Sequence, residues 1–316
     1  MHESLSMRRA RKSLMQRFHS GFSFGKECIA ITDVLRFLLV KNPIPTLTKL
    51  PAVRTVQSHW IRPARSNTHH SYGRASWFQR TDSKMKFCVE SERQHGYLAP
   101  YSLTAYADDR TGLLPAEVFP ILNVAPGAKL TMMELACDFS PLSSVTRDFV
   151  LRHGVFGKSW RDLSMENPAG DWWGAKRGAK RSKSYFKDEI CGHRVELRMR
   201  SRFLNRYGIY GVYDFGRFVR ILPRRHIFFA VLSDELLTER LRGSGFSTEQ
   251  TLGILRKVNG LTGDLSATLS YLRRQVKLTN VQRLLTPLPE NRLVLEALRS
   301  WAEMWPAAPA RLGEKK

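Results

Sequence analysis

Residues 129–140 read KLTMMELACDFS, a long segment whose alternating pattern is typical of a β-strand. Residues 85–91, MKFCVES, alternate in the same way. Residues 143–157, SSVTRDFVLRHGVFG, have the spacing of an amphipathic helix, and Ser143 or Ser144 could cap it. Three further strands are predicted at 171–177, 184–190 and 193–199. This order of elements predicts an α+β fold, an antiparallel sheet with flanking helices.

The pattern becomes helical from about residue 231. Four helices are predicted, within residues 233–243, 247–260, 264–277 and 290–305. They fit either a helix-turn-helix that reads DNA or a small bundle that only packs. We therefore divide the chain into a basic, poorly packed N-terminal arm with one apolar run that could be a helix (1–84), an α+β catalytic domain (85–230), and a small helical C-terminal region that is a candidate for DNA binding (231–316).

The charge balance predicts a polyanionic partner. The chain has 316 residues, 51 Lys+Arg against 28 Asp+Glu, and a formal net charge of +23. The excess lies before residue 80 and within residues 171–230, while the block between them is nearly neutral and slightly acidic. Nucleic acid is the commonest polyanion that such proteins bind. This distribution suggests acidic chemistry placed beside a surface for nucleic acid.

The location of the protein is also predicted from the sequence. The apolar run Ile29–Val40 is broken by Asp33 and Arg36 and is too short to span a bilayer, so no membrane association is expected. The four cysteines have neither metal-ligand spacing nor the density of a disulfide framework. We therefore expect a cytoplasmic protein in a reducing compartment.

Common signatures of nucleotide hydrolysis and zinc chemistry are missing from the sequence, but one carboxylate pair stands out. Glu134 and Asp138 are four residues apart on a predicted strand, so both project from one face, opposite Leu135 and Cys137. Oxygen ligands of this kind suit Mg²⁺ or Mn²⁺. The plain alternative is a strand whose polar face is solvated.

A second candidate segment covers residues 172–204, WWGAKRGAKRSKSYFKDEICGHRVELRMRSRFL. Tyr185 lies among cations there, and its oxygen could attack a phosphorus atom and keep the phosphate as a phosphotyrosine. Lys187 would favour the phenolate form of Tyr185. Glu189 and Glu196 could complete a metal site with the carboxylate pair. Candidate ligands of DNA phosphates are Lys176, Arg177, Lys180, Arg181, Lys183 and Arg194.

Taken in order, these motifs resemble the replication initiation factor family, the Rep-trans type initiators of rolling-circle plasmids and some phages. Glu134-Leu-Ala136-Cys-Asp138 is similar to the family's Asp-x-Ala-x-Asp strand, with Glu in place of the first Asp. Gly174 precedes Tyr185-Phe-Lys187 by the family's eleven residues, and Arg194-Val-Glu196 matches its Arg-x-Glu strand. Gly178 lies near the position of a serine that is usual in the family. The resemblance covers roughly residues 85–215.

The resemblance implies an endonuclease and strand transferase that acts on DNA at a replication origin. Tyr185 would nick one strand and hold the 5′ phosphate, a divalent metal on the carboxylates would polarise the scissile phosphate, and Lys187 would stabilise its charge or assist proton transfer. A single-stranded or supercoiled origin is the expected DNA, with a host helicase and a second copy of the chain as further partners. The motifs do not distinguish a plasmid from a phage.

Other functions fit parts of the sequence. A non-catalytic nucleic-acid-binding protein would use the same basic segments, with Trp172, Trp173 and Phe186 as stacking surfaces. A tyrosine recombinase needs a His-x-x-Arg motif, which only His59-Trp-Ile-Arg62 in the N-terminal arm supplies. A structural or protein-interaction role needs no catalytic residue at all. Convergence of Tyr185 with the carboxylates in space would separate the nicking enzyme from the binding protein.

Overall fold

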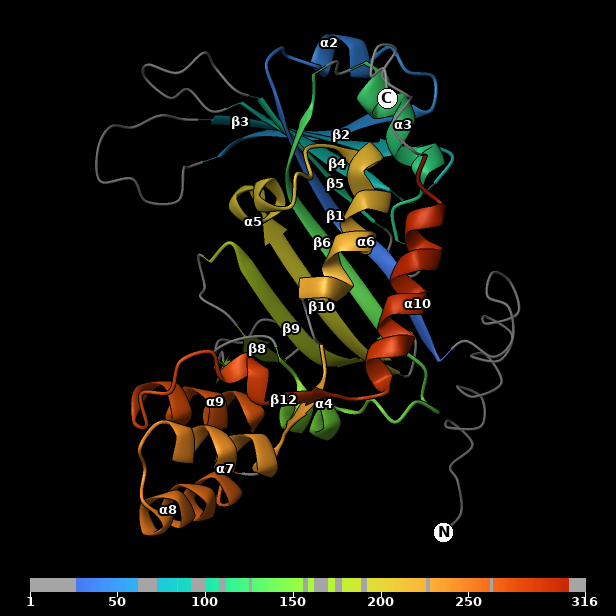
Figure 1. Cartoon of the computed structure of the whole chain (residues 1–316). Helices are drawn as coiled ribbons and strands as arrows, with labels where there is room; N and C mark the ends of the chain where they lie inside the picture. Colours follow the sequence, from blue (N-terminus) through green and yellow to red (C-terminus); the bar gives the residue numbers. More distant parts are fainter. Residues whose placement is uncertain are drawn as a thin grey trace, which may run out of the picture.

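We describe the fold from a computed structural model of the chain (Figure 1). The residues that the structure describes are 27–61, 73–83, 85–91, 101–107, 112–124, 127–155, 159–161, 170–173, 178–188, 192–225, 228–261 and 264–306.

An antiparallel sheet forms the centre of the molecule, and over the described ranges it has ten strands in the order β2-β3-β4-β5-β1-β6-β10-β9-β8-β7. All neighbouring strands run antiparallel. The strands are β1 Cys28–Leu39, β2 Val53–Ile61, β3 Gly73–Arg80, β4 Lys86–Ser91, β5 Tyr101–Tyr106, β6 Lys129–Phe139, β7 Ser159–Arg161, β8 Asp171–Trp173, β9 Lys180–Lys187 and β10 Gly192–Arg200. The predicted α+β fold with an antiparallel sheet is confirmed.

Strand β6 lies in the middle of the sheet. Its side chains point alternately to an apolar face and to a polar face of the sheet. Leu135 and Cys137 are buried in the main core, as the alternation predicts. Helix α10 (Glu290–Glu303) packs against β1 and α6 (Phe215–Arg225), and both helices contribute to this core (Figure 1). Shorter elements are α2 Ile44–Leu47, α3 Pro115–Asn123, α5 Ser201–Arg206 and the 3₁₀ helices η2 Val212–Asp214 and η3 Val281–Leu284.

The expectation of a poorly packed arm over residues 1–84 is wrong for much of that segment. The apolar run Ile29–Val40, for which a helix was considered, lies almost entirely in strand β1 between β5 and β6, and β2 and β3 extend the same sheet. Leu35, Phe37 and Leu39 of β1 are almost completely buried. A strand covered on both faces is a nearly continuous apolar run, which periodicity cannot distinguish from a buried helix.

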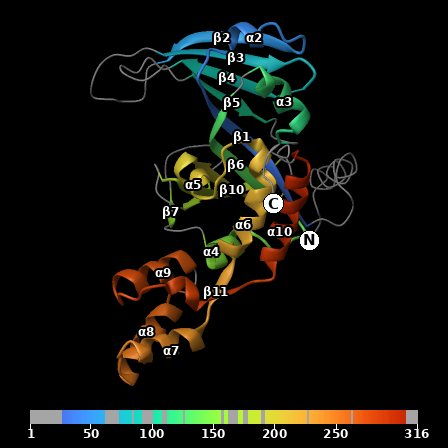
Figure 2. The same ribbon diagram turned by 45° about the horizontal axis from the view of Figure 1, so that its top comes forward.

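The predicted C-terminal region is divided between two hydrophobic cores. Helices α7 (Asp234–Gly243), α8 (Thr248–Asn259) and α9 (Leu265–Arg274) form a second core with β11 (Ala230–Leu232) and β12 (Leu285–Pro287). Figure 2 shows this unit at the opposite end of the molecule from β2, β3 and β4. Helix α10 instead belongs to the main core. The boundary proposed near residue 231 therefore holds for α7–α9 but not for α10.

Helix α10 is joined to β1 by a buried polar contact. Trp301 on α10 is 1% exposed, and its Nε1 donates a hydrogen bond of 2.7 Å to Oγ1 of Thr32. The ring of Trp301 also packs against Phe215 at the start of α6, with ring centroids 4.9 Å apart. An indole nitrogen needs a partner once it is buried, and Thr32 supplies one. The C-terminal helix is thus fixed to the strand that carries Asp33.

The predicted helices form with small shifts at their ends. Helix α8 begins after Ser247, which forms a capping box with Gln250, and the helix ends before Gly260. Helix α4 spans Arg147–His153, and its cap is Thr146 rather than Ser143 or Ser144. The side chain of Thr146 accepts a hydrogen bond from the Phe149 amide, which satisfies one of the free amides of the first turn. No helix in the described ranges is long and apolar enough to cross a membrane.

Candidate functional site

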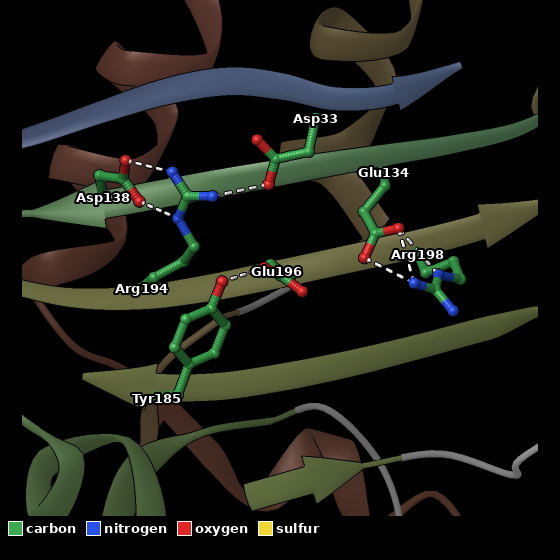
Figure 3. A network of polar contacts seen from close by, with 7 residues as sticks. All are labelled: Asp33, Glu134, Asp138, Tyr185, Arg194, Glu196 and Arg198. Carbon is green, nitrogen blue, oxygen red and sulfur yellow. Dashed lines mark hydrogen bonds and ion pairs between the residues drawn. The ribbon is translucent and has the colours of Figure 1, made fainter. Parts of the chain in front are cut away.

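The predicted site residues lie on the face of the sheet opposite α6 and α10, where β9, β10, β6 and β1 run side by side (Figure 3). Arg194 on β10 pairs with Tyr185 on β9 and with Asp138 on β6. Two residues further along β10, Glu196 pairs with Lys183. Since residues directly opposite in a sheet point to the same side, the register brings these side chains together. Tyr185 and the carboxylates therefore share one surface.

Arg194 connects the carboxylates of two strands. Its Nε and Nη2 donate to Oδ1 and Oδ2 of Asp138 at 2.5 and 2.6 Å, and its Nη1 donates to Oδ2 of Asp33 at 2.8 Å (Figure 3). Arg194 is only 2% exposed. Burial lowers the pKa of Arg194. The hydrogen bonds to Asp138 and the charge of Asp33 raise it by more than burial lowers it, so the guanidinium stays charged. Removing one partner of such a buried pair costs about 3–5 kcal/mol.

A β-bulge places Asp33 on this surface. The register between β1 and β6 shifts between Thr32 and Val34, because Thr32 pairs with Leu135 and Val34 with Glu134. Asp33 is the extra residue, so it escapes the alternation of β1 while Thr32 points to Trp301 on the other face. Bulges turn a side chain in this way and are common beside active sites.

The Asp33 carboxylate has only part of its charge compensated. Its Oδ1 is buried without a hydrogen-bond partner, although Oδ2 is bound by Arg194. Burial raises the pKa of Asp33 to about 7, and the charges of Glu196 and Asp138 raise it too, whereas Arg194 and Lys187 lower it. Asp33 is therefore a carboxylate that exchanges its proton near neutral pH.

Glu134 is bound to a second arginine. Nε and Nη2 of Arg198 donate to the two carboxylate oxygens of Glu134 at 2.9 and 3.0 Å. Burial raises the pKa of Glu134 to about 7, Arg198 lowers it, and the charges of Glu196 and Asp33 raise it. The side chain of Arg198 is 32% exposed, against 6% for Glu134. Arg198 is thus the part of this network that faces solvent.

The hydroxyl of Tyr185 is bound to Glu196. Tyr185 Oη donates to Glu196 Oε1 at 2.5 Å, and Nζ of Lys183 lies 4.6 Å from the centroid of the tyrosine ring. Burial raises the pKa of Tyr185 well above its ordinary value, and the charge of Glu196 and the hydrogen bond to it raise it further. The expected phenolate favoured by Lys187 is therefore wrong for this arrangement. The neutral phenol is held beside a carboxylate that can accept its proton.

The predicted cations lie along β9 and β10. Arg181, Lys183 and Lys187 alternate with Ser182, Ser184 and Phe186, so they share the face of Tyr185, and all three are buried. Burial lowers the pKa of Lys180, at the start of β9, to about 8. Among the predicted site residues, Lys176, Arg177 and Glu189 lie outside the described residues.

The described site also shows how the predicted metal ligands are arranged. Glu134 and Asp138 each bind a guanidinium with both oxygens, and Glu196 binds Tyr185. As they lie here, the described histidine, cysteine, aspartate and glutamate side chains form no group of three that could hold a metal ion. Burial is the main cause of the raised pKa of Glu134, and the charges of Glu196 and Asp33 add to it, so several carboxylates lie close together, as a hard divalent cation requires.

A second polar cluster lies on the face of β9 opposite Tyr185. Ser184 Oγ shares a hydrogen bond with His193 Nε2, and both residues are buried. Nearby, Arg147 Nε at the start of α4 donates to Oδ2 of buried Asp171 at 2.7 Å. Burial lowers the pKa of His193 to about 4, so the ring is neutral near pH 7. This cluster lies opposite Tyr185 and fixes β9 between β8 and β10.

Sequence reasoning missed two members of the site, Asp33 and Arg198. Asp33 was visible as a charge inside the apolar run Ile29–Val40, a position that a buried strand does not tolerate without a partner. Arg198 follows Arg194 and Glu196 with the spacing of one strand face. Both signals were present, but they gain meaning only from the pairing of β1, β6 and β10.

No protein-family model and no curated protein matches the chain.

Proposed function

We propose that the protein nicks one DNA strand and transfers it, as a rolling-circle replication initiator, through a covalent 5′-phosphotyrosine at Tyr185. The observation that carries the proposal is the hydrogen bond of 2.5 Å from the Tyr185 hydroxyl to Glu196, on a surface lined by buried lysines and arginines. A phenol beside a base and beside fixed cations is the combination that attack on a phosphodiester requires.

Glu196 acts as the general base in this scheme. The pKa of Tyr185 is raised by burial and by Glu196, so the phenol does not ionise by itself at neutral pH. As its oxygen attacks phosphorus, the proton moves to Glu196 and the bond from phosphorus to the 3′ oxygen breaks. That oxygen takes up a proton from solvent and leaves as a hydroxyl. The reverse sequence joins a 3′ hydroxyl to the held 5′ phosphate and returns the proton to Tyr185. Such proton transfers contribute about 10²–10⁴-fold to a rate.

The cations of the site stabilise the charge that develops on the phosphate. Lys183 lies over the ring of Tyr185, and the charge of Arg194 favours negative charge on the Tyr185 oxygen, whose pKa it lowers. Arg194 is held in place by Asp138 and Asp33 before any substrate binds. Charges that are fixed in advance lose little energy to reorganisation during the reaction. Arg198, which is partly exposed, would meet the incoming strand first.

A Mg²⁺ or Mn²⁺ ion is part of the proposal because the carboxylates are hard oxygen donors. Glu134 would hold it after the partly exposed Arg198 turned aside, with Glu189 as a further candidate, while Asp138 stays bound to Arg194 and Glu196 to Tyr185. When bound, the ion would polarise the non-bridging oxygens of the scissile phosphate. A host helicase and a second copy of the chain are proposed as partners, because the resemblance to rolling-circle initiators implies both.

One observation favours the non-catalytic alternative. Tyr185 is only 8% exposed, and Glu134 and Asp138 are already neutralised by arginines. A protein that only binds nucleic acid would use this network to stiffen its sheet and would use the remaining cations for phosphates. The two functions differ in whether substrate DNA reaches the Tyr185 hydroxyl.

Cleavage of DNA from the protein's own replicon tests the proposal. Supercoiled and single-stranded forms are incubated with and without Mn²⁺ and separated on a denaturing gel. The wild type should nick and Tyr185→Phe should not, while both bind the DNA equally, because only one hydroxyl is lost. Tyr106→Phe, a change in the same sheet, is the matched control and should nick normally. Equal cleavage by wild type and Tyr185→Phe contradicts the nucleophile, and binding without cleavage by the wild type supports the alternative.

A further inference from the structure

A pair of exposed tyrosines projects from the segment between α5 and α6, which the nicking mechanism does not use. Tyr210 is 50% exposed and Tyr213 is 44% exposed. Between and beside them, Ile209, Val212 and Phe215 are almost completely buried. The segment is thus anchored by a buried side chain at every third position. The rings of Tyr210 and Tyr213 reach the surface, and that of Tyr213 also packs on Phe119, with ring centroids 5.5 Å apart. Aromatic rings with this exposure are available to a partner.

Hydrogen bonds hold this segment in one conformation. The amides of Tyr210 and Gly211 donate to Oδ2 of Asp214 at 2.8 and 3.0 Å, and the amide of Leu130 on β6 donates to the Tyr210 carbonyl at 2.7 Å. Gly208 has φ +67, a conformation that favours glycine. A platform fixed in advance loses little conformational entropy when a ligand binds.

The surroundings of the two rings are positively charged. Nζ of Lys129 lies 5.6 Å from the centroid of the Tyr210 ring. Arg206 ends α5, and the guanidinium of Arg217 on α6 lies against Gly208, where a Cβ atom would meet its Nη1 at 3.1 Å. All three cations are exposed. Asp214 uses its carboxylate on the backbone amides of the segment. Exposed rings among cations favour an anionic ligand with flat, apolar groups.

Single-stranded nucleic acid has this chemistry, since its bases are free to stack and its phosphates need cations. Duplex DNA lacks it, because its bases are already stacked on each other. We propose that Tyr210, Tyr213 and Lys129 form a stacking platform for single-stranded nucleic acid, separate from the nicking site. The platform begins at Lys129, about 17 Å along β6 from Glu134, a span of five strand residues. It does not depend on whether Tyr185 cleaves DNA.

The test measures binding in the Tyr185→Phe background, so that cleavage plays no part. Fluorescence anisotropy with labelled oligo-dT, oligo-U and a DNA duplex gives three affinities for each variant. Tyr210→Ala with Tyr213→Ala should weaken oligo-dT binding about tenfold or more, since one base–aromatic stack is worth about that much. Duplex affinity should stay the same. Comparison of oligo-dT with oligo-U distinguishes DNA from RNA.

Conservative variants keep the test sharp. The double change Tyr210→Phe with Tyr213→Phe retains the rings and should bind oligo-dT like the parent protein, which carries only Tyr185→Phe. Lys129→Gln should make the slope of log affinity against log salt concentration shallower by about the amount of one phosphate contact. Leu142→Ala, at a leucine that is 84% exposed, controls for loss of an exposed apolar group. The inference is overturned if the alanine pair binds oligo-dT normally, if it weakens single strands and duplex equally, or if the parent binds no single strand. Unchanged melting temperatures establish that every variant is folded.

Discussion

Replacement of Asp33 by asparagine should change how the stability of the fold depends on pH. In the folded protein the pKa of Asp33 is about 7, against an ordinary value of 3.8, because burial and the charges of Glu196 and Asp138 outweigh Arg194 and Lys187. The folded state therefore binds the proton more tightly than the unfolded state does. This contribution is fully present below about pH 4 and is lost as the pH rises to about 7.

The size of the effect follows from that shift. One proton bound more tightly by the folded state changes the unfolding free energy by about 1.4 kcal/mol per pH unit. Between pH 5 and pH 7 the wild type should therefore lose up to about 3 kcal/mol through Asp33, and Asp33→Asn should not. Glu134 also makes the stability fall as the pH rises, because its pKa in the folded protein is raised to about 7. His193 makes the stability rise with pH, because its pKa in the folded protein is lowered to about 4. The His193 contribution is common to wild type and variant. The Glu134 contribution differs between them only through the Asp33 charge, which is the smallest effect on the Glu134 pKa, so most of the difference comes from Asp33 itself.

Urea unfolding at pH 5, 6, 7 and 8 measures this difference. The stability of Asp33→Asn relative to wild type should rise between pH 5 and pH 7 and then level off. Asp234→Asn, a change at an exposed aspartate at the start of α7, is the control for loss of a carboxylate and should leave the pH profile as it is. A relative stability that does not vary with pH would refute the account of Asp33 as a poorly compensated buried carboxylate.

Three further changes test other parts of the structure. Glu196→Gln removes the proton acceptor of Tyr185 and should slow nicking about 10²–10⁴-fold with DNA affinity intact, which single-turnover cleavage measures; normal cleavage would exclude Glu196 as the base. Arg194→Lys keeps the charge but cannot bind Asp138 with two donors while reaching Asp33, so it should destabilise the fold by about 3 kcal/mol in urea unfolding, and an unchanged midpoint would contradict the bridging role. Trp301→Phe loses the hydrogen bond to Thr32 and should lower the free energy of unfolding by about 1–3 kcal/mol. The double variant Trp301→Phe with Thr32→Val should be little less stable than either single variant. If the two losses of stability simply add, the hydrogen bond is not their cause.

The parts of the fold that depend on local pattern could be predicted from the sequence. Strand β6 alternates, and the capping box at Ser247 marks the start of α8, so both were found with nearly correct bounds. The shared face of Glu134 and Asp138 also follows from strand geometry alone. These features need no information about distant segments of the chain.

Strand β1 and its aspartate could not be found in that way. The run Ile29–Val40 is apolar because Leu35, Phe37 and Leu39 pack in the main core and α10 packs against β1, and its partner β6 begins about 100 residues later. The bulge that turns Asp33 toward Arg194 exists only in the pairing of β1 with β6. The arginine on each of Glu134 and Asp138 likewise depends on the register of β10, which the sequence does not state.

The central claim is that Tyr185 becomes covalently attached to DNA. The direct measurement is mass spectrometry of peptides from the protein after incubation with single-stranded DNA of its own replicon and Mn²⁺, followed by nuclease digestion. The account predicts a nucleotide linked through a 5′ phosphate to the peptide that contains Tyr185, and its loss in Tyr185→Phe. Cleaved DNA with no such peptide, or with the nucleotide on another residue, would contradict it.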